Sequence, residues 1–278
     1  MNMKKIVWRG LLGRKVLALD LFLQQQQKVA IGFSGGADST FLAAVAAQAL
    51  GKNALAVTID TPFLARAELC EARALARRLG LRHRVVRINV LEHRQVAANP
   101  PDRCYFCKTI DFQAVRRVAR RAGIECLCDG SNVDDAGDYR PGARAVSELG
   151  VRSPLRECGF TKADIRAASR KLGLSTAAKP AMACLASRFP YGTPITAEAL
   201  LKVERAEAAL HALGFRQCRV RLHGDVGRLE LPPADLGRAV AQRERILRQL
   251  KAAGLRYIAL DLEGYRMGSL NEMLKKNE

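Results

Sequence analysis

The sequence predicts an α/β protein in which a doubly wound parallel sheet is followed by a smaller α+β domain. Short apolar runs alternate with segments of helical periodicity through the first part of the chain, and this alternation is typical of β-α-β units. Several of these apolar runs end in Gly, Ser, Asn and Asp residues, at the strand ends where open α/β sheets bind ligands. The pattern changes after residue 196. We therefore expect a first domain at 1–178, a connecting loop at 179–196 and a second domain at 197–278.

The predicted strands of the first domain are short and apolar, and turn residues follow them. They cover residues 29–33, 54–60, 84–90, 125–129 and 151–155. Apolar residues spaced by three and four predict the helices between them. These helices cover residues 14–27, 41–50, 65–80, 109–122 and 161–172.

In the second domain, His223-Gly-Asp225 predicts a hairpin between strands at 218–222 and 226–231, because such residues favour tight turns. A third strand is expected at 257–262, and helices are expected at 197–213 and 234–253. The preceding segment, 175–196, has prolines at 180, 190 and 194 and little periodicity. A long loop of this kind is usually functional.

Composition excludes some classes of protein. No apolar run reaches the roughly 20 residues needed to span a membrane, and the first residues lack a signal-peptide core, so we expect a cytoplasmic protein. The net charge of +19 favours nucleic acid or anionic small molecules as partners. The eight cysteines of a cytosolic chain are expected to be thiols, metal ligands or catalytic groups rather than disulfides.

The segment from Lys28 to Thr40 predicts a nucleotide site. An apolar strand stops at a Ser-Gly-Gly turn and a helix follows, so backbone N–H groups and the positive helix end can bind phosphate. Asp38 adds a carboxylate that suits Mg²⁺. The alternative is a glycine turn that only connects strand to helix. The residues assigned to nucleotide binding here are Ser34, Gly35, Gly36, Asp38, Ser39 and Thr40.

This loop resembles the SGGxDS loop of the PP-loop ATP pyrophosphatases. It differs from the GxxxxGK[ST] phosphate loop because no lysine follows its second glycine. The resemblance implies that the loop holds the β,γ-pyrophosphate of ATP while AMP passes to a substrate oxygen.

Polar residues at two further strand ends are expected on the same side of the sheet. Asp60 closes the second predicted strand and is assigned to the adenosine site. Gly130, Asn132 and Asp135 follow the fourth predicted strand. We add all four to the nucleotide-binding residues.

Three cysteines stand apart from the rest. Cys104 and Cys107 form a CxxC before a helix, and Cys184 lies in the proline-containing loop, where Lys179 and Arg188 are cations that favour a thiolate. Three thiolates leave one iron of a [4Fe–4S] cluster without a protein ligand. Alternatively, CxxC is a redox pair or half of a zinc site, and Cys184 is a chance loop thiol. The other five are expected to pack inside the protein: Cys70, Cys126, Cys128, Cys158 and Cys218.

Arginines gather around the hairpin of the second domain. Strand alternation places Arg219 and Arg221 on one face, and paired guanidinium groups suit a phosphate. Arg228 lies across the turn and Arg266 follows the last strand. A solvated basic strand face is the alternative.

These motifs together resemble the LarE sulfur transferases, which help to build the nickel-pincer nucleotide of lactate racemase. The similarity covers nearly the whole chain and is carried by residues 34–39, 104–108, 129–135, 182–188 and 219–272. It implies that the chain uses ATP to adenylate a carboxylate of pyridinium-3,5-dicarboxylate mononucleotide, releasing pyrophosphate and then AMP. Thiocarboxylate replaces the carboxylate, twice.

The resemblance also implies roles for individual residues. In one branch of the family, a single cysteine at the position of Cys184 gives up its sulfur and becomes dehydroalanine. In another, three cysteines carry a [4Fe–4S] cluster that relays sulfide, and Cys104 and Cys107 place this chain there. The implied catalytic residues are Cys184, Asp38, Ser187 and Arg188, and the implied substrate-phosphate ligands are Arg219, Arg221 and Arg266. Glu207 and Asp261 match acidic positions of the family.

Two other functions remain open. An iron–sulfur-dependent tRNA thiolase can combine the same loop with three cysteines, and the high positive charge favours it, but the tail resembles LarE and RNA is the less favoured partner. A nucleotide-binding sensor would leave ATP intact. The expected substrate is a nucleotide-like small molecule, and the expected assembly is a homo-oligomer. The sulfur donor stays unidentified.

Overall fold

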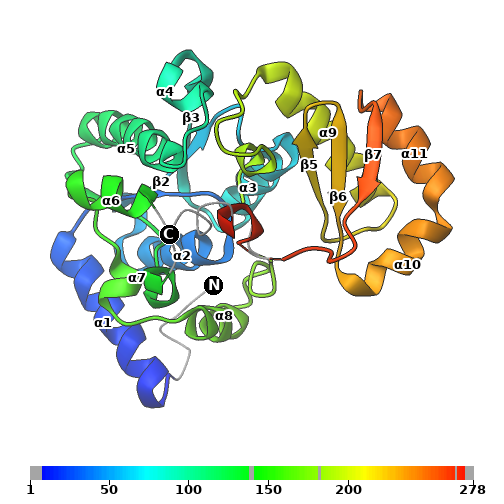
Figure 1. Ribbon diagram of the computed structural model, residues 1–278. Coiled ribbons are helices and arrows are strands. Elements are labelled where there is room, and N and C mark those ends of the chain that lie inside the picture. Colours follow the sequence, from blue (N-terminus) through cyan, green and yellow to red (C-terminus); the bar gives the residue numbers. More distant parts are fainter. Residues whose placement is uncertain (1–7, 138–140, 181–182, 267, 273–278) are drawn as a thin grey trace. The chain divides into compact units, whose positions relative to one another are not determined.

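The computed structural model describes residues 8–137, 141–180, 183–266 and 268–272, and the chain divides into two units (Figure 1). The first unit contains residues 1–90 and 104–182, and the second contains 91–103 and 183–278. The sequence-based domain boundaries at 178 and 196 stay predictions. Among the described helices, none is long and apolar enough to cross a membrane.

Four parallel strands form the sheet of the first unit, in the order β3-β2-β1-β4. They are β1 Val29–Gly32, β2 Ala54–Asp60, β3 Arg82–Arg87 and β4 Cys126–Cys128. The chain passes from β1 outward to β3 and then returns to place β4 on the other side of β1. This reversal makes the carboxyl ends of β1 and β4 the topological switch point, where such sheets bind ligands. The predicted parallel sheet is confirmed.

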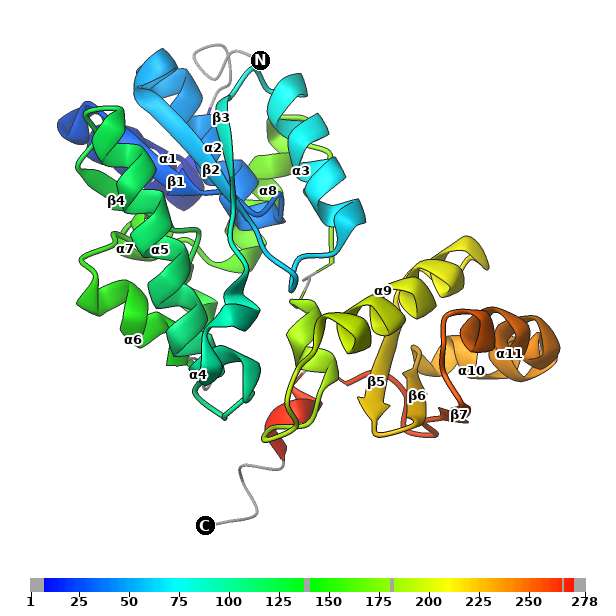
Figure 2. The ribbon, with the colours of Figure 1, turned by 90° about the horizontal axis from the view of Figure 1, so that it is seen from above.

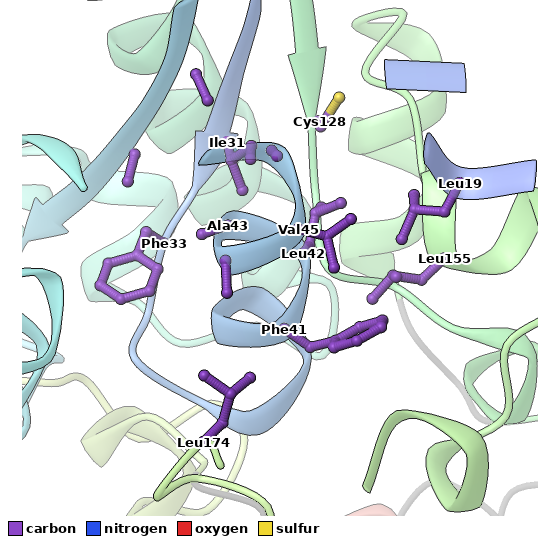
Figure 3. Close-up of a cluster of buried hydrophobic side chains, with 14 of the residues drawn as sticks. Leu19, Ile31, Phe33, Phe41, Leu42, Ala43, Val45, Cys128, Leu155 and Leu174 are labelled. Carbon is purple, nitrogen blue, oxygen red and sulfur yellow. The ribbon is translucent and has the colours of Figure 1, made fainter. Parts of the chain in front are cut away.

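Helices cover both faces of this sheet (Figures 1 and 2). One face packs against α1 Gly10–Gln26, α2 Ala37–Leu50, α3 Arg66–Arg78 and α8 Lys162–Lys171. The other packs against α5 Arg103–Arg121 and α6 Pro141–Glu148. Helix α2 is apolar on most sides, because it is enclosed by the sheet, α1 and α8. Figure 3 shows its Phe41, Leu42 and Val45 within the core, and burying each such side chain contributes about 1.5–3 kcal/mol.

Short helical segments connect the main elements. The first unit contains η2 Gly51–Asn53, η4 Val133–Gly137 and α7 Pro154–Glu157. The second unit contains α4 Arg94–Ala97, η5 Leu185–Arg188 and η6 Ser269–Asn271, and η3 Val90–Glu92 begins at the boundary between the units.

The second unit has a three-stranded sheet in the order β5-β6-β7. β5 Arg219–His223 and β6 Val226–Glu230 are antiparallel, as the predicted hairpin requires, and β7 Tyr257–Leu260 is parallel to β6. α9 Ala197–Ala212, α10 Pro233–Ala241 and α11 Arg243–Ala252 contribute with the strands to one apolar core. Backbone bonds from Gly192 N to Asn99 O (2.8 Å) and from Ile195 N to Ala97 O (2.7 Å) join the 91–103 segment to this unit.

The fifth predicted strand, at 151–155, is wrong. Arg152 makes only an isolated bridge to Cys128, and α7 begins at Pro154. Proline cannot donate to a strand ladder, whereas its fixed φ suits the first turn of a helix. The third strand is also displaced, because β3 ends at Arg87.

The single helix predicted at 234–253 is two helices that meet at Gln242. A straight helix of 20 residues is about 30 Å long, whereas three strands span only about 10 Å. The break lets Ala239 of α10 and Ile246 and Leu250 of α11 enter the same core.

Candidate active site

The loop between β1 and α2 closely approaches α3. Gly35 has φ +72°, and a Cβ atom there would lie 3.1 Å from both Cα and Cβ of Ala72. A side chain would therefore meet both backbone strain and a steric conflict. Gly36 is the residue that precedes the first turn of α2. The predicted strand–turn–helix arrangement is confirmed, and its backbone N–H groups lie at the switch point of the sheet.

Two serine hydroxyls hold the loop in its turn. Ser34 Oγ lies 3.1 Å from Ser39 Oγ, and Gly36 N donates to Ser34 Oγ over 3.3 Å. Ser39 Oγ also accepts from Ser34 N over 3.3 Å. These contacts fix both hydroxyls beside the N-terminus of α2.

Asp38 forms an ion pair with Lys162 of α8 through its Oδ2 atom. Its other oxygen, Oδ1, is buried and has no hydrogen-bond partner among the described residues, and the same holds for Thr40 Oγ1. An unsatisfied buried carboxylate oxygen is costly. The site therefore fits a hard cation with oxygen ligands, such as Mg²⁺.

Lys179 also lies at this loop. Its Nζ donates to Gly35 O over 3.2 Å and pairs with Glu71 Oε2 at 2.9 Å. The sequence suggested that Lys179 favours a thiolate at Cys184. In the structure its ammonium group is directed at the loop after β1, within the first unit.

The end of β2 is more strongly paired than the sequence suggested. Asp60 is buried and receives a 2.6 Å ion pair from Arg66, which also donates to the carbonyls of Thr61 and Leu64. Thr58 donates to Phe33 O over 2.7 Å and contacts His83 Nε2 at 2.8 Å. Thr58 therefore supports the base of the loop from β2.

The loop after β4 lies against the first turn of α2. A Cβ atom on Gly130 would be 3.0 Å from Ser39 N. Asn132 is buried; its Oδ1 accepts from Asp134 N at 3.0 Å, and its N donates to Asp135 Oδ2 at 2.9 Å. The structure thus brings the 130–135 loop and the loop after β1 together.

In the second unit, the backbone around Cys184 is held by its neighbours. Its carbonyl accepts from Ser187 N (2.9 Å), Ser187 Oγ (2.8 Å) and Arg188 Nη1 (3.1 Å). Arg188 is only 2% exposed and donates to Glu207 through Nε (2.9 Å) and Nη2 (2.8 Å). A buried two-bond pair of this kind fixes orientation strongly, so Ser187 and Arg188 position the cysteine segment. Met182, the first residue of the 182–188 segment that carries the family resemblance, lies outside the described residues.

Arg103 reaches the same segment from 81 positions earlier. Its Nη1 donates to Asn99 Oδ1 (2.6 Å) and Ala186 O (3.0 Å), and its Nη2 lies 4.0 Å from Cys184 Sγ. This buried cation has no role in the site predicted from the sequence.

The CxxC does not precede the helix as predicted, because α5 already begins at Arg103. Cys104 and Cys107 are three residues apart in its first turns, in the first unit, and this spacing makes them neighbours on a helix. Cys184 belongs to the second unit, where it is exposed. The structure therefore describes the pair and the single thiol separately. Among the residues it describes, no group of three or more His, Cys, Asp or Glu side chains is arranged to hold a metal ion.

The other five cysteines were expected to pack inside the protein, and they differ in how far they are buried. Cys128 and Cys218 are buried, and burial raises the pKa of Cys218 to about 12. Cys126 and Cys158 are half-buried. The prediction for Cys70 is wrong, because this residue is exposed on α3 while Leu69 and Ala72 face the core.

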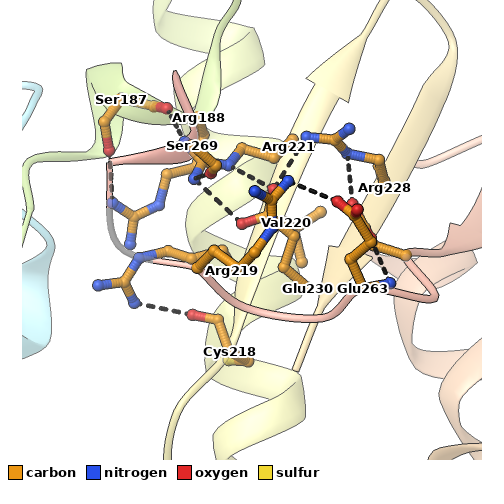
Figure 4. Close-up of polar contacts among 12 residues, drawn as sticks. Ser187, Arg188, Cys218, Arg219, Val220, Arg221, Arg228, Glu230, Glu263 and Ser269 are labelled. Atoms are coloured by element: carbon orange, nitrogen blue, oxygen red, sulfur yellow. Dashed lines mark hydrogen bonds and ion pairs between the residues drawn. The ribbon is translucent and has the colours of Figure 1, made fainter. Parts of the chain in front are cut away.

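Arg221 of β5 and Arg228 of β6 form an ion network around the buried Glu230 (Figure 4). Arg221 donates to both oxygens of Glu230 over 3.0 Å, and Arg228 Nη2 donates to Glu230 Oε1 over 2.9 Å. Arg221 also donates to Ser187 O over 2.5 Å. A solvated basic strand face is therefore wrong for Arg219 and Arg221, which are 6% and 7% exposed.

Arg219 differs from its neighbours in its partners. Its Nη1 donates to Cys218 O over 2.8 Å, and its guanidinium lies 5.3 Å from the ring centre of Tyr265. Among the described residues, no carboxylate oxygen lies within 4.0 Å of its guanidinium nitrogens. Burial and the charge of Arg188 lower its pKa. A buried guanidinium without a carboxylate suits an anionic ligand.

A cavity of about 230 Å³ lies beside this network, entirely within the second unit. Arg221, His223, Arg228 and Arg266 contribute to its lining. Burial, followed by the charges of Arg228 and Arg221, lowers the pKa of His223. Arg266 pairs with Glu263 and Glu272, each at 2.5 Å. The predicted phosphate ligands Arg221 and Arg266 thus border one cavity.

Comparisons with known proteins give the family of the chain. Residues 15–101, which include the loop after β1, match the NAD synthase family. The chain is 38% identical to the pyridinium-3,5-bisthiocarboxylic acid mononucleotide synthase of Lactiplantibacillus plantarum, over 95% of this chain and 96% of that protein.

The chain belongs to the LarE family. An uncharacterized protein of Synechocystis sp. is 41% identical over 96% of this chain and all of that protein. An uncharacterized protein of Methanocaldococcus jannaschii is more distant, at 28% identity over 87% of this chain and 92% of that protein. This family is one of ATP-using enzymes built on a PP-loop domain.

Two lysines that the sequence did not assign to the site, Lys162 and Lys179, contact the loop after β1 in this LarE-family chain. Lys162 immediately follows Thr161, whose hydroxyl caps α8. A cation in the first turn of a helix opposes the helix dipole. This unfavourable placement is visible in the sequence and indicates that Lys162 has another role. Lys179 has no comparable local signal, because it lies in a loop before Pro180.

Proposed function

We propose that this protein is an ATP-dependent sulfur transferase that adenylates a carboxylate of pyridinium-3,5-dicarboxylate mononucleotide and converts it to thiocarboxylate. The single observation that carries the proposal is the nearly full-length similarity to the L. plantarum synthase. The loop geometry supports it, because Gly35, Ser39 and Asp38 form a phosphate and cation site at the switch point of the sheet.

In the first half of this reaction, the loop after β1 binds the phosphates that leave. The N–H groups at the start of α2 and the hydroxyls of Ser34 and Ser39 donate hydrogen bonds to them. Asp38 would hold Mg²⁺ through its unsatisfied Oδ1, and the ion would supply charge neutralisation to the phosphates. The adenosine is assigned to the ends of β2 and β4, at Asp60, Gly130, Asn132 and Asp135.

The substrate's own phosphate is assigned to Arg219, Arg221 and Arg266 of the second unit. Arg219 carries a buried charge that no described carboxylate pairs with, while Arg221 and Arg266 border the cavity. Two guanidinium groups can bind a phosphate through parallel hydrogen bonds.

For the sulfur step, we assign Cys104, Cys107 and Cys184 as the ligands of a [4Fe–4S] cluster. The donor set fits, because thiolates are the usual ligands of such clusters and none of the three forms a disulfide. A cluster held by three cysteines would supply an open iron at which external sulfide can bind. Ser187, Arg188 and Arg103 hold the Cys184 segment in place. The competing assignment is a Cys184 that gives up its own sulfur.

The deciding experiment follows the phosphorus products of ATP by ³¹P NMR in the presence of the dicarboxylate nucleotide and Mg²⁺. Adenylation yields AMP and pyrophosphate, and Asp38→Ala removes both. Products of ADP and phosphate would contradict the proposal.

We further propose that the protein is cytoplasmic and forms a homo-oligomer. Light scattering of the purified chain measures its assembly.

A further inference from the structure

The loop after β1 supplies no lysine to the phosphates it would bind. Ala37 and Asp38 follow Gly36, and Asp38 adds a negative charge. In GxxxxGK[ST] loops, a lysine inside the motif reaches the β- and γ-phosphates. A pyrophosphate group that leaves with several negative charges needs comparable cations here, and one Mg²⁺ offsets only part of that charge.

The folded chain brings two lysines to this loop from far away in the sequence. Lys162 Nζ contacts Asp38 Oδ2 from 124 positions further along the chain. Lys179 Nζ contacts Gly35 O from 144 positions further along. Both lysines lie in the first unit, as does the loop, so their contacts are internal to one unit.

The ion pair between Lys179 and Glu71 does not explain why Lys179 lies at the loop. Glu71, the carboxylate partner of Lys179, is 64% exposed while Lys179 is only 19% exposed. An ion pair with an exposed carboxylate contributes little to stability, yet the Lys179 side chain is largely buried and its Nζ donates to the backbone of the loop. Lys162 occupies one oxygen of Asp38 and leaves Oδ1 for a cation. The lysine and Mg²⁺ can therefore use the same carboxylate together.

We propose that Lys162 and Lys179 bind the β- and γ-phosphates of ATP and the pyrophosphate that leaves. This inference rests on the proposed adenylation. In that step a carboxylate oxygen of the substrate forms a bond to the α-phosphorus. The bond from the α-phosphorus to the oxygen that bridges to the β-phosphate breaks, and its electron pair leaves with pyrophosphate. The two ammonium groups lie beside the residues of the loop where this charge develops.

The test measures pyrophosphate binding directly, by calorimetry on the full chain with Mg²⁺ present. Lys162→Met and Lys179→Met keep an apolar stem and remove the charge. Each should weaken pyrophosphate binding about 10- to 100-fold, the scale for losing a charged hydrogen bond, and leave AMP binding unchanged. Lys171→Met is the matched control. Lys171 is on the same helix as Lys162, but its ammonium lies 5.1 Å from the ring centre of Trp8.

A second measurement uses the unaltered protein and does not depend on how the variants fold. Amine acetylation followed by peptide mass spectrometry should show that pyrophosphate protects Lys162 and Lys179 but not Lys52. If pyrophosphate binds without protecting either lysine, or if both variants bind it as tightly as Lys171→Met, the assignment is wrong. A wild-type protein that forms no AMP from ATP would instead refute the adenylation itself.

Discussion

Arg188 and Glu207 form a two-bond ion pair inside the second unit, with both side chains almost completely removed from water. Glu207 Oε1 also accepts from Val220 N over 2.9 Å, and Arg188 donates to the carbonyls of Ala183 and Cys184. One carboxylate on α9 therefore links β5 to the cysteine segment.

The Arg188–Glu207 pair predicts a large loss of stability when one partner is neutralised. Glu207→Gln leaves a buried guanidinium without a counter-charge, which typically costs about 3–5 kcal/mol. Urea unfolding followed by circular dichroism measures it. Glu198→Gln on the same helix is the control, because its ion pair with Lys202 is exposed and such pairs contribute less than about 1 kcal/mol. Equal losses in the two variants would show that Glu207 has no special structural role.

The close approach of Gly35 to Ala72 predicts that Gly35→Ala loses ATP binding. The added methyl would meet backbone at 3.1 Å in a residue with φ +72°, so the loop must move away from α3. Calorimetric titration with ATP measures the effect. Gly51→Ala separates backbone strain from steric conflict, since Gly51 has φ +56° but an added Cβ there would meet no atom within 4 Å. Gly51→Ala should lose about 1–3 kcal/mol of stability, the cost of holding a side chain in this backbone region, and bind ATP normally.

Arg219 pairs with no carboxylate of the described residues, and this predicts a separate effect on the nucleotide substrate. Arg219→Gln should weaken binding of a pyridine mononucleotide by about 1–3 kcal/mol. ATP affinity should stay unchanged, because the loop after β1 is in the first unit and Arg219 is in the second. Arg256→Gln is the control, as Arg256 is 70% exposed and pairs with Asp225. If the Arg219 variant binds the mononucleotide like the control, the phosphate is bound elsewhere.

His83 predicts a pH dependence of stability. Burial and the charge of Arg73 lower its pKa from the usual 6.5, so the folded protein binds this proton less tightly than the unfolded chain does. Stability from this residue is therefore complete above about pH 6.5 and falls as the pH decreases through the folded pKa. Urea unfolding at several pH values should show a shallower acid slope for His83→Gln than for wild type. His93→Gln, at an exposed position, should keep the wild-type slope.

The parts of the site that the sequence predicted are those specified by neighbouring residues. The loop after β1 follows from an apolar strand, two glycines and a helix start within a dozen positions, and the same reasoning located the 130–135 loop. The prediction of a strand at 151–155 was wrong for an equally local reason, since Pro154 favours a helix start over a strand ladder.

The contacts that the sequence did not predict join residues far apart in the chain. Lys162 and Lys179 reach the loop across 124 and 144 positions, and Arg103 reaches Cys184 across 81. Periodicity and turn chemistry report only on neighbours. Which charged side chain faces a distant loop is decided by packing, and a single sequence does not contain that information in readable form.

The last prediction concerns the sulfur step. An acyl-adenylate hydrolyses in water, so a sulfur nucleophile must be close when it forms. A lone Cys184 could attack, but its sulfur would then have to be cleaved from its own carbon, and the protein would be spent after one transfer. A cluster held by Cys104, Cys107 and Cys184 would allow repeated turnover with external sulfide. Anaerobic reconstitution should give about four irons per chain. A Cys→Ser substitution at any one of these three positions should remove the cluster.

Cys70→Ser is the control for that iron count, because Cys70 is an exposed thiol on α3 outside the proposed set. Intact mass after turnover separates the two chemistries: the cluster predicts an unchanged polypeptide, since the transferred sulfur comes from solution. Loss of one hydrogen sulfide at Cys184, together with full activity in Cys104→Ser, would identify Cys184 as the sulfur source. The CxxC at the start of α5 would then need another explanation, because its two cysteines would take no part in the transfer.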